Sequence, residues 1–161
     1  DLYRISVVGC GLSDISGISG CEDLSVIVLA QNNITDVSPL QNIKTAYVKM
    51  DLSYNPIRDI SSLPKVNYSV LCLLCPDLDP TTFRDLDGNM MVLYYSQEAV
   101  EHIMSLKKFT YAVVGCPADK QVALEDAINS ARLRFPKTME QLVEMLMTLD
   151  YDASYLLGNE E

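Results

Sequence analysis

Apolar residues recur at fixed offsets around an asparagine in the first half of the chain. The clearest copy covers residues 24–40, where the spacing is L-x-x-I-x-L-x-x-N-x-I-x-x-V-x-x-L. The same spacing surrounds Asn55 and, with a cysteine in the asparagine position, Cys10. The step is 22 residues from Cys10 to Asn32 and 23 residues from Asn32 to Asn55. A period of this length is typical of solenoids in which every repeat adds one strand.

Within each repeat the strand residues alternate between two faces. Ile27 and Leu29 are therefore predicted to point into a core, while Val26 and Val28 point away from it. One repeat cannot bury its apolar side alone, so the repeats are predicted to stack their strands into a parallel sheet. The amides of Asn32 and Asn55, and the equivalent turn at Cys10, are predicted to satisfy backbone groups where the chain bends.

The units become longer in the second half of the chain. We expect one domain over residues 1–161, with short strand–turn repeats over 1–88, longer strand–helix repeats over 89–135, and a capping helix with an acidic, loosely ordered tail over 136–161. The predicted elements after residue 88 are strands over 90–95 and 109–115 and helices over 97–107, 120–133 and 138–149. The alternative is that this half forms a separate small α/β domain.

The repeat pattern of residues 1–66 resembles that of leucine-rich-repeat proteins of the internalin-like class. The resemblance implies an α/β leucine-rich-repeat solenoid with a curved parallel sheet, short turns or helices on its convex side and a C-terminal capping helix. It also implies a bacterial-type, secreted or cell-surface, non-catalytic module that binds a partner protein on its concave face. The residues themselves show no convincing catalytic or metal-ligand set, so no cofactor or metal is expected.

Composition limits the classes of partner that the chain is expected to bind. The net charge of −10 and a pI of about 4.4 argue against nucleic acid, because no basic patch is available to neutralise phosphates. The apolar runs are shorter than the roughly 18–20 residues of a membrane span, so membrane insertion is not expected. The five cysteines fit a cytoplasmic protein as well, which leaves localisation open. Asp1 opens in mid-repeat, so we expect a fragment or a mature form.

Three groups of side chains suggest chemistry. Cys116 lies between a predicted strand and a predicted helix, where a nucleophile paired with His102 would make the chain an enzyme or a regulatory domain. The pair Cys72 and Cys75 has the spacing of a zinc or redox site, but small buried hydrophobes are the preferred reading. The acidic residues of 77–87 suggest calcium, but they lack an EF-hand pattern and a solvated loop is preferred. A structural segment of a longer repeat protein is a further alternative.

The outward strand positions carry the main functional hypothesis. Most of them are apolar, although a sheet with one wet face normally carries polar residues there. This face is expected to bind a partner protein or a second copy of the chain, unless the tail or another part of the full-length protein covers it. Self-association through the sheet edge is a further expectation. The candidate partner-binding residues are Val26, Lys49, Asp51, Val70, Leu74, Met91, Leu93, Tyr95 and Tyr111, with the two tyrosines as anchors.

Overall fold

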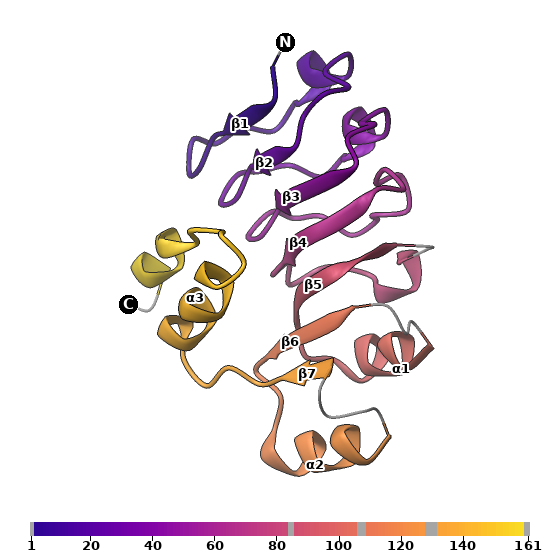
Figure 1. Ribbon diagram of the computed structural model, residues 1–161, viewed down its shortest axis with the longest axis vertical. Helices are drawn as coiled ribbons and strands as arrows, with labels where there is room; N and C mark the ends of the chain where they lie inside the picture. The colour runs from indigo at the N-terminus through magenta and orange to yellow at the C-terminus, as the bar shows by residue number, and fades with distance from the viewer. Residues whose placement is uncertain (1, 84–85, 106–108, 128–131, 160–161) are drawn as a thin grey trace.

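Seven parallel strands form one sheet whose spatial order follows the chain, from β1 to β7 (Figure 1). The computed structural model describes residues 2–83, 86–105, 109–127 and 132–159. The strands are β1 (Arg4–Ser6), β2 (Val26–Val28), β3 (Tyr47–Asp51), β4 (Asn67–Leu73), β5 (Asp87–Tyr94), β6 (Thr110–Val114) and β7 (Leu133–Arg134). Strands β5 to β7 extend the sheet begun by the short repeats, as expected for a continuous solenoid.

The return segments change in kind along the chain. Those between β1 and β3 and between β4 and β5 contain a single turn of 3-10 helix, and those after β5 and β6 contain α-helices. These elements are η1 (Ser16–Ile18), η2 (Ser38–Leu40), η3 (Pro80–Thr82), α1 (Gln97–Ser105) and α2 (Ala118–Ala127), and the chain ends with α3 (Met139–Met147) and η5 (Ser154–Asn159). The predicted helix over 120–133 is wrong at its end, because Leu133 pairs with Tyr111 and belongs to β7. The last residues of the helix predicted over 97–107 lie outside the described residues.

Each strand presents alternate side chains to two faces of the sheet. One column across β1–β4 is Arg4, Val26, Lys49 and Val70, and the next is Ser6, Val28, Asp51 and Cys72. We call the face that carries these columns the outer face, and the opposite one the core face. The outer face corresponds to the face that the sequence predicts to bind a partner.

The core face packs against the return segments. Ile27 and Leu29, the inward residues of the clearest repeat, are 0% exposed in this core. Leu24, Ile34 and Leu40 of the same repeat are equally buried. The fixed apolar offsets of the sequence are therefore the positions that fill the space between successive repeats.

Asn32 ties the first two repeats together. Its side-chain Oδ1 accepts hydrogen bonds from the backbone N–H groups of Cys10 and Leu12, at 3.0 and 3.1 Å. Its Nδ2 donates to the carbonyl oxygen of Val7 at 2.8 Å. The side chain is buried, and it supplies the hydrogen bonds that water would otherwise make to the backbone groups at the turn.

Hydrogen bonds of the same kind join the next repeats, and we call this series the asparagine ladder. Asn55 Oδ1 accepts from the backbone N–H of Ile34 at 3.0 Å, and Nδ2 donates to the carbonyl of Leu29 at 2.9 Å. One repeat further, the Cys75 thiol donates to the carbonyl of Leu52 at 3.2 Å. Because Leu52 follows its strand as Leu29 follows β2, Cys75 takes over this part of the asparagine's role.

The register changes at β5. Val70 of β4 pairs with Met90, and Met90 pairs with Thr110 of β6. The sequence analysis predicts that Met91 and Tyr111 face outward beside Val70, which is wrong by one residue. Since side chains alternate with a period of two, a shift of one residue moves every side chain of a strand to the other face.

The shift removes four residues from the predicted binding face. Met91, Leu93 and Tyr111 are buried in the core, and Tyr95 packs against that core as a partly buried residue. The expectation that they face outward, with Tyr95 and Tyr111 as anchors, is therefore wrong. The outer positions of β5 are taken by Met90, Val92 and Tyr94.

Candidate functional site

The outer face of the sheet is covered in part by the end of the chain, residues 139–159, which we call the C-terminal segment. In Figure 1 this segment, in yellow, lies on the side of the sheet opposite the 3-10 turns and α1. The helix α3 begins after Thr138, whose hydroxyl oxygen accepts a hydrogen bond from the N–H of Gln141 at 3.1 Å. The prediction of a loosely ordered tail is wrong, because Ala153 and Leu156 are 0% and 1% exposed.

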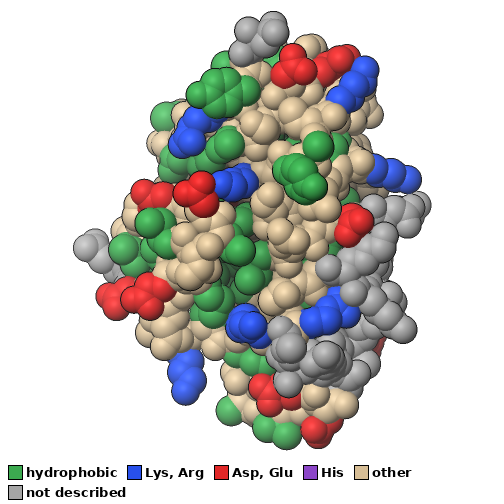
Figure 2. Space-filling model, in the orientation of Figure 1, with side chains coloured by type: hydrophobic (Ala, Val, Ile, Leu, Met, Phe, Trp, Pro, Cys, Tyr) green, Lys and Arg blue, Asp and Glu red, His purple; other side chains and the backbone are tan. Residues whose placement is uncertain are grey.

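Apolar side chains join the C-terminal segment to the sheet. Leu142 and Leu146 lie on one side of α3 and are both 0% exposed. The buried members of this second apolar cluster are Val28, Val70, Cys72, Leu74, Met90, Val92, Ala112, Leu142, Leu146, Tyr151, Ala153 and Leu156. In Figure 2 hydrophobic side chains gather where the segment lies against the sheet. The chain thus supplies its own cover for part of the apolar outer face.

A buried carboxylate anchors the C-terminal segment. Asp51 is 1% exposed, and its Oδ2 accepts hydrogen bonds from the hydroxyls of Tyr151 and Tyr155, at 2.6 and 2.5 Å. Its Oδ1 accepts from the N–H of Ser53 at 3.0 Å. Burial raises the pKa of Asp51 above its ordinary 3.8, although these hydrogen bonds act in the opposite direction. The two tyrosine hydrogen bonds join the C-terminal segment to β3 at Tyr151 and Tyr155.

Two further polar contacts flank this anchor. The Lys49 ammonium donates to the carbonyl oxygen of Asp150 at 2.7 Å and lies 3.4 Å from that residue's carboxylate. The hydroxyls of Tyr94 and Tyr54 are hydrogen-bonded at 3.2 Å. Asp150 has a φ of 57°, in the left-handed region, and lies between α3 and η5. The Lys49–Asp150 contact joins the C-terminal segment to β3, whereas the Tyr54–Tyr94 contact lies within the repeats, between the end of β3 and β5.

The predicted binding residues that do face outward divide into two groups. Asp51, Val70 and Leu74 lie beneath the C-terminal segment and are 1% exposed each. Val26 and Lys49 are partly exposed beyond its edge. Tyr151 and Tyr155 were missed as site residues. Their four-residue spacing, with Leu156 beside them, could have indicated that the acidic tail has an apolar side.

A pocket of about 530 Å³ remains open at the β1–β3 end of the outer face. We call it the N-terminal pocket. The sheet supplies Arg4, Ser6, Val8, Val26, Val28 and Lys49, and the C-terminal segment supplies Met147, Asp150, Tyr151, Asp152, Ser154 and Tyr155. It combines partly exposed valines with both signs of charge and tyrosines, a composition that suits protein recognition better than catalysis.

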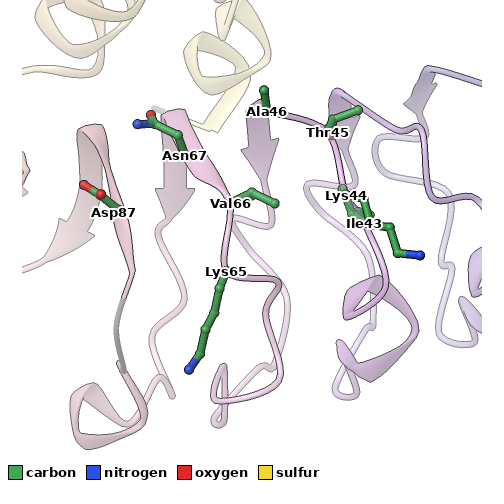
Figure 3. A pocket seen from close by; sticks show the side chains of 8 residues that line it. All are labelled: Ile43, Lys44, Thr45, Ala46, Lys65, Val66, Asn67 and Asp87. Atoms are coloured by element: carbon green, nitrogen blue, oxygen red, sulfur yellow. The ribbon is translucent and has the colours of Figure 1, made fainter.

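A larger hollow of about 630 Å³ lies at the N-terminal ends of β3 and β4 (Figure 3). Lys44, Lys65 and Asp87 are among its lining residues. Their side chains point in different directions in Figure 3 and do not converge on a common point. This hollow therefore has the character of a groove between successive repeats.

The cysteines are separated by the fold. Cys72 lies beneath the C-terminal segment, whereas Cys75 belongs to the core, so the two thiols are on different faces. Burial raises the pKa of Cys75 to about 12 and that of Cys72 well above its ordinary value. Among the residues that the structure describes, no group of three or more histidine, cysteine or acidic side chains could hold a metal ion. Cys72 is an outer-face residue of β4, and Cys75 is a turn residue that bonds to the carbonyl of Leu52.

Cys116 has a thiol that is less acidic than usual. Partial burial, with Asp119 nearby, raises its pKa, and a raised pKa reduces the thiolate that a nucleophile needs. Its hydrogen-bonding partner is the carbonyl oxygen of Pro117, at 3.6 Å. The side chain of His102, its predicted partner, lies outside the described residues.

Among the helices that the structure describes, none combines the length and apolarity needed to cross a membrane.

Known proteins resemble half of this chain. It is 33% identical over 84 residues, or 52% of its length, to leucine-rich repeat-containing protein 56 of Mus musculus, Homo sapiens and Rattus norvegicus. The chain covers only 13% of the mouse protein and 14% of the human and rat proteins. No protein-family model matches the chain. No solved structure matches it. The likeness to mammalian proteins and the parallel sheet together support a leucine-rich-repeat-like solenoid, without assigning the internalin-like class.

Proposed function

We propose that the chain is a non-catalytic protein-interaction module whose partner binds at the N-terminal pocket. The supporting observation is the unequal covering of the outer face. The apolar column positions over β4–β6 are buried under the C-terminal segment, while Val8 and Val26 remain partly exposed beside it. The leucine-rich-repeat likeness supports protein partners in general, and the internalin-like spacing favours the sheet face as the place where they bind.

The side chains of the pocket suit a protein partner. Val8 and Val26 offer apolar area, while the Arg4 guanidinium can orient acidic or polar groups of the partner. Tyr155 forms one wall, and tyrosine combines a large apolar surface with a hydroxyl. The partner would thus contact the sheet and the C-terminal segment together. In this proposal α3 and η5 act as the structural cover that shapes the site, rather than as a detachable ligand.

The test compares partner capture by three immobilised chains. Val26→Asp places a charge in the pocket, and Val122→Asp places the same charge on the exposed surface of α2, where Val122 is 59% exposed. A protein retained by the wild type and by Val122→Asp but lost from Val26→Asp supports the proposal. A partner retained equally by all three chains would place the binding site elsewhere. Sedimentation of the three chains shows whether the partner is a second copy.

A further inference from the structure

We propose that the partner bound at the N-terminal pocket presents an extended segment, which pairs as an added strand with the open edge of β1. This inference rests on the function proposed above and adds to it the conformation and side-chain pattern of the partner. β1 lies at one end of the sheet, so β2 pairs with it on one side, and no described strand pairs with its other side (Figure 1). Strand addition binds a peptide through its backbone and selects it through alternate side chains.

The backbone groups of β1 alternate between β2 and the open edge. The N–H of Val7 donates to the carbonyl oxygen of Val28 in β2 at 2.8 Å, and the carbonyl of Tyr3 accepts from β2 at 3.2 Å. Successive residues of a strand direct their backbone groups to opposite sides, so those of Arg4 and Ser6 point to the open edge. These N–H and carbonyl groups are a ready template for a further strand.

The open edge and the N-terminal pocket share their residues. Arg4 and Ser6 are exposed, and they line the pocket together with Val8. The thiol of Cys10 donates to the carbonyl oxygen of Val8 at 3.4 Å, which marks the end of the open stretch. An added strand would therefore place alternate side chains over the outer face, directly beside the pocket.

The other side chains of the added strand would meet the end of the core. Ile5 and Val7 belong to the core and remain partly exposed. The equivalent residues of the next repeat, Ile27 and Leu29, are 0% exposed. Apolar side chains on the core face of an added strand would cover Ile5 and Val7 and remove apolar surface from water.

Charge sets one further feature of the partner. Arg4 has no ion-pair partner among the described residues, although the chain carries a net charge of −10. Of the acidic residues that line the pocket, Asp150 pairs with Lys49, and Asp152 accepts from the N–H of Ser154 at 2.9 Å. An acidic residue beside Arg4 would stabilise the added strand, because opposite charges on adjacent strands attract. The expected segment is thus apolar on one face and carries an acid on the other.

The test uses fluorescent peptides that differ in their backbone donors. The probe is acetyl-Thr-Ile-Asp-Ile-Thr-amide, which has the expected pattern and reads the same in both directions. One variant is N-methylated at Asp, another is N-methylated at both Ile, and a third replaces Asp by Asn. Because alternate amides of a strand point to opposite edges, one methylated peptide loses its donors toward β1 and the other is its matched control.

The chains are the wild type, Ser6→Pro and Ser6→Ala. Proline removes the N–H that points to the open edge and no bond to β2, and it is tolerated where a strand N–H faces solvent. Ser6→Ala keeps this N–H and is the matched control. Fluorescence polarisation measures affinity, and thermal melting checks folding. Hydrogen exchange of the free wild type compares the Ser6 amide with that of Val7.

We expect saturable binding of the probe to the wild type and to Ser6→Ala, and at least about tenfold weaker binding to Ser6→Pro. One methylated peptide should lose binding while the other keeps it, and the one that loses it gives the direction of the strand. The Asn peptide should bind more weakly than the probe. The Ser6 amide should exchange faster than the Val7 amide.

Equal binding of the two methylated peptides to the wild type would overturn the proposal even if Ser6→Pro is unfolded. Protection of the Ser6 amide in the free chain would also overturn it, because the edge is then already paired, within the protein or with a second copy. A partner that is lost from Val26→Asp but is not displaced by the probe would overturn the strand pairing and leave the proposed function intact. Edge binding of the probe, with a partner retained by Val26→Asp, would support the pairing and contradict the proposed function.

Discussion

The hydroxyl of Tyr151 donates a 2.6 Å hydrogen bond to the carboxylate of Asp51, which lies one hundred residues earlier in the chain. Tyr155 donates to the same oxygen. Taking a carboxylate out of water is costly unless hydrogen bonds replace the water. The outer face therefore carries a carboxylate oxygen, Asp51 Oδ2, whose two tyrosine donors both come from the C-terminal segment.

Removing the Asp51 carboxylate should loosen the C-terminal segment. In Asp51→Ala the two tyrosine hydroxyls stay buried without this acceptor, which should reduce the free energy of unfolding by about 1–3 kcal/mol. Hydrogen exchange of the α3 amides should become faster, while that of β2 and β3 changes less. Asp23→Ala, which removes an exposed carboxylate, is the control. Unchanged exchange in α3 would show that the apolar contacts alone hold the segment.

The pH dependence of Asp51 should be opposite to that of the exposed turn carboxylates. Burial raises the Asp51 pKa above 3.8, so its contribution to stability is full below the unfolded pKa and is lost as pH rises through the folded value. A hydrogen bond from Ser38 lowers the pKa of Asp36, whose contribution is present above the unfolded pKa and is lost as pH falls through the folded one. Carboxyl NMR titration should give midpoints on opposite sides of 3.8. An Asp51 midpoint below 3.8 would mean that the hydrogen bonds outweigh burial.

The asparagine ladder should be essential to the stack. Asn55→Ala leaves the buried N–H of Ile34 without its acceptor, at a cost of about 1–3 kcal/mol, and removes one of the two amide donors to the carbonyl of Leu29. Asn33→Ala, at an exposed position, should have little effect. Chemical denaturation of both variants measures the difference. Equal stability of the two would contradict the role given to the buried amide.

The sequence predicts the first four strands better than the next three. In β1–β3 the outer positions include Arg4, Ser6, Lys49 and Asp51, so polar residues mark one face and the register follows. The stretch from Met90 to Tyr95 is apolar at every position, and alternation then gives no sign of which side chains point inward. The step from Val70 to its partner in β5 is 20 residues, shorter than the 22 and 23 of the clear repeats, and only the packed structure reveals it.

The candidate site was predicted in part for a different reason. Val26 and Lys49 were placed correctly on the outer face because the repeats around them are regular. The sequence allows that another part of the chain covers this face, but the polar anchor of that cover depends on a contact across one hundred residues, between Asp51 and Tyr151. No local pattern reports such a contact. A lone aspartate in an apolar column was nevertheless a usable signal, since a buried carboxylate requires donors from another part of the chain.

Alkylation should separate four of the five thiols by environment. Cys10 is exposed and should react first with iodoacetamide at neutral pH, whereas Cys72 and Cys75 are buried with raised pKa values and should react only on unfolding. Cys116 should react slowly, because partial burial raises its pKa. Mass spectrometry of timed samples gives the order. Fast labelling of Cys116 would instead support the hypothesis that it is a catalytic nucleophile.

Uncovering the outer face should make the chain self-associate. Leu142→Ser together with Leu146→Ser puts two hydroxyls into the second apolar cluster, where both leucines are 0% exposed, and should release α3. The core formed by the other face does not include these residues, so the repeats should stay folded. Sedimentation velocity should show dimers or larger species, because a broad apolar sheet face is then exposed to water. Met147→Ser changes a residue that is 54% exposed and should remain like the wild type. If the double variant stays monomeric with a folded far-UV spectrum, the face beneath the segment is not adhesive, and the partner surface is confined to what the segment leaves open.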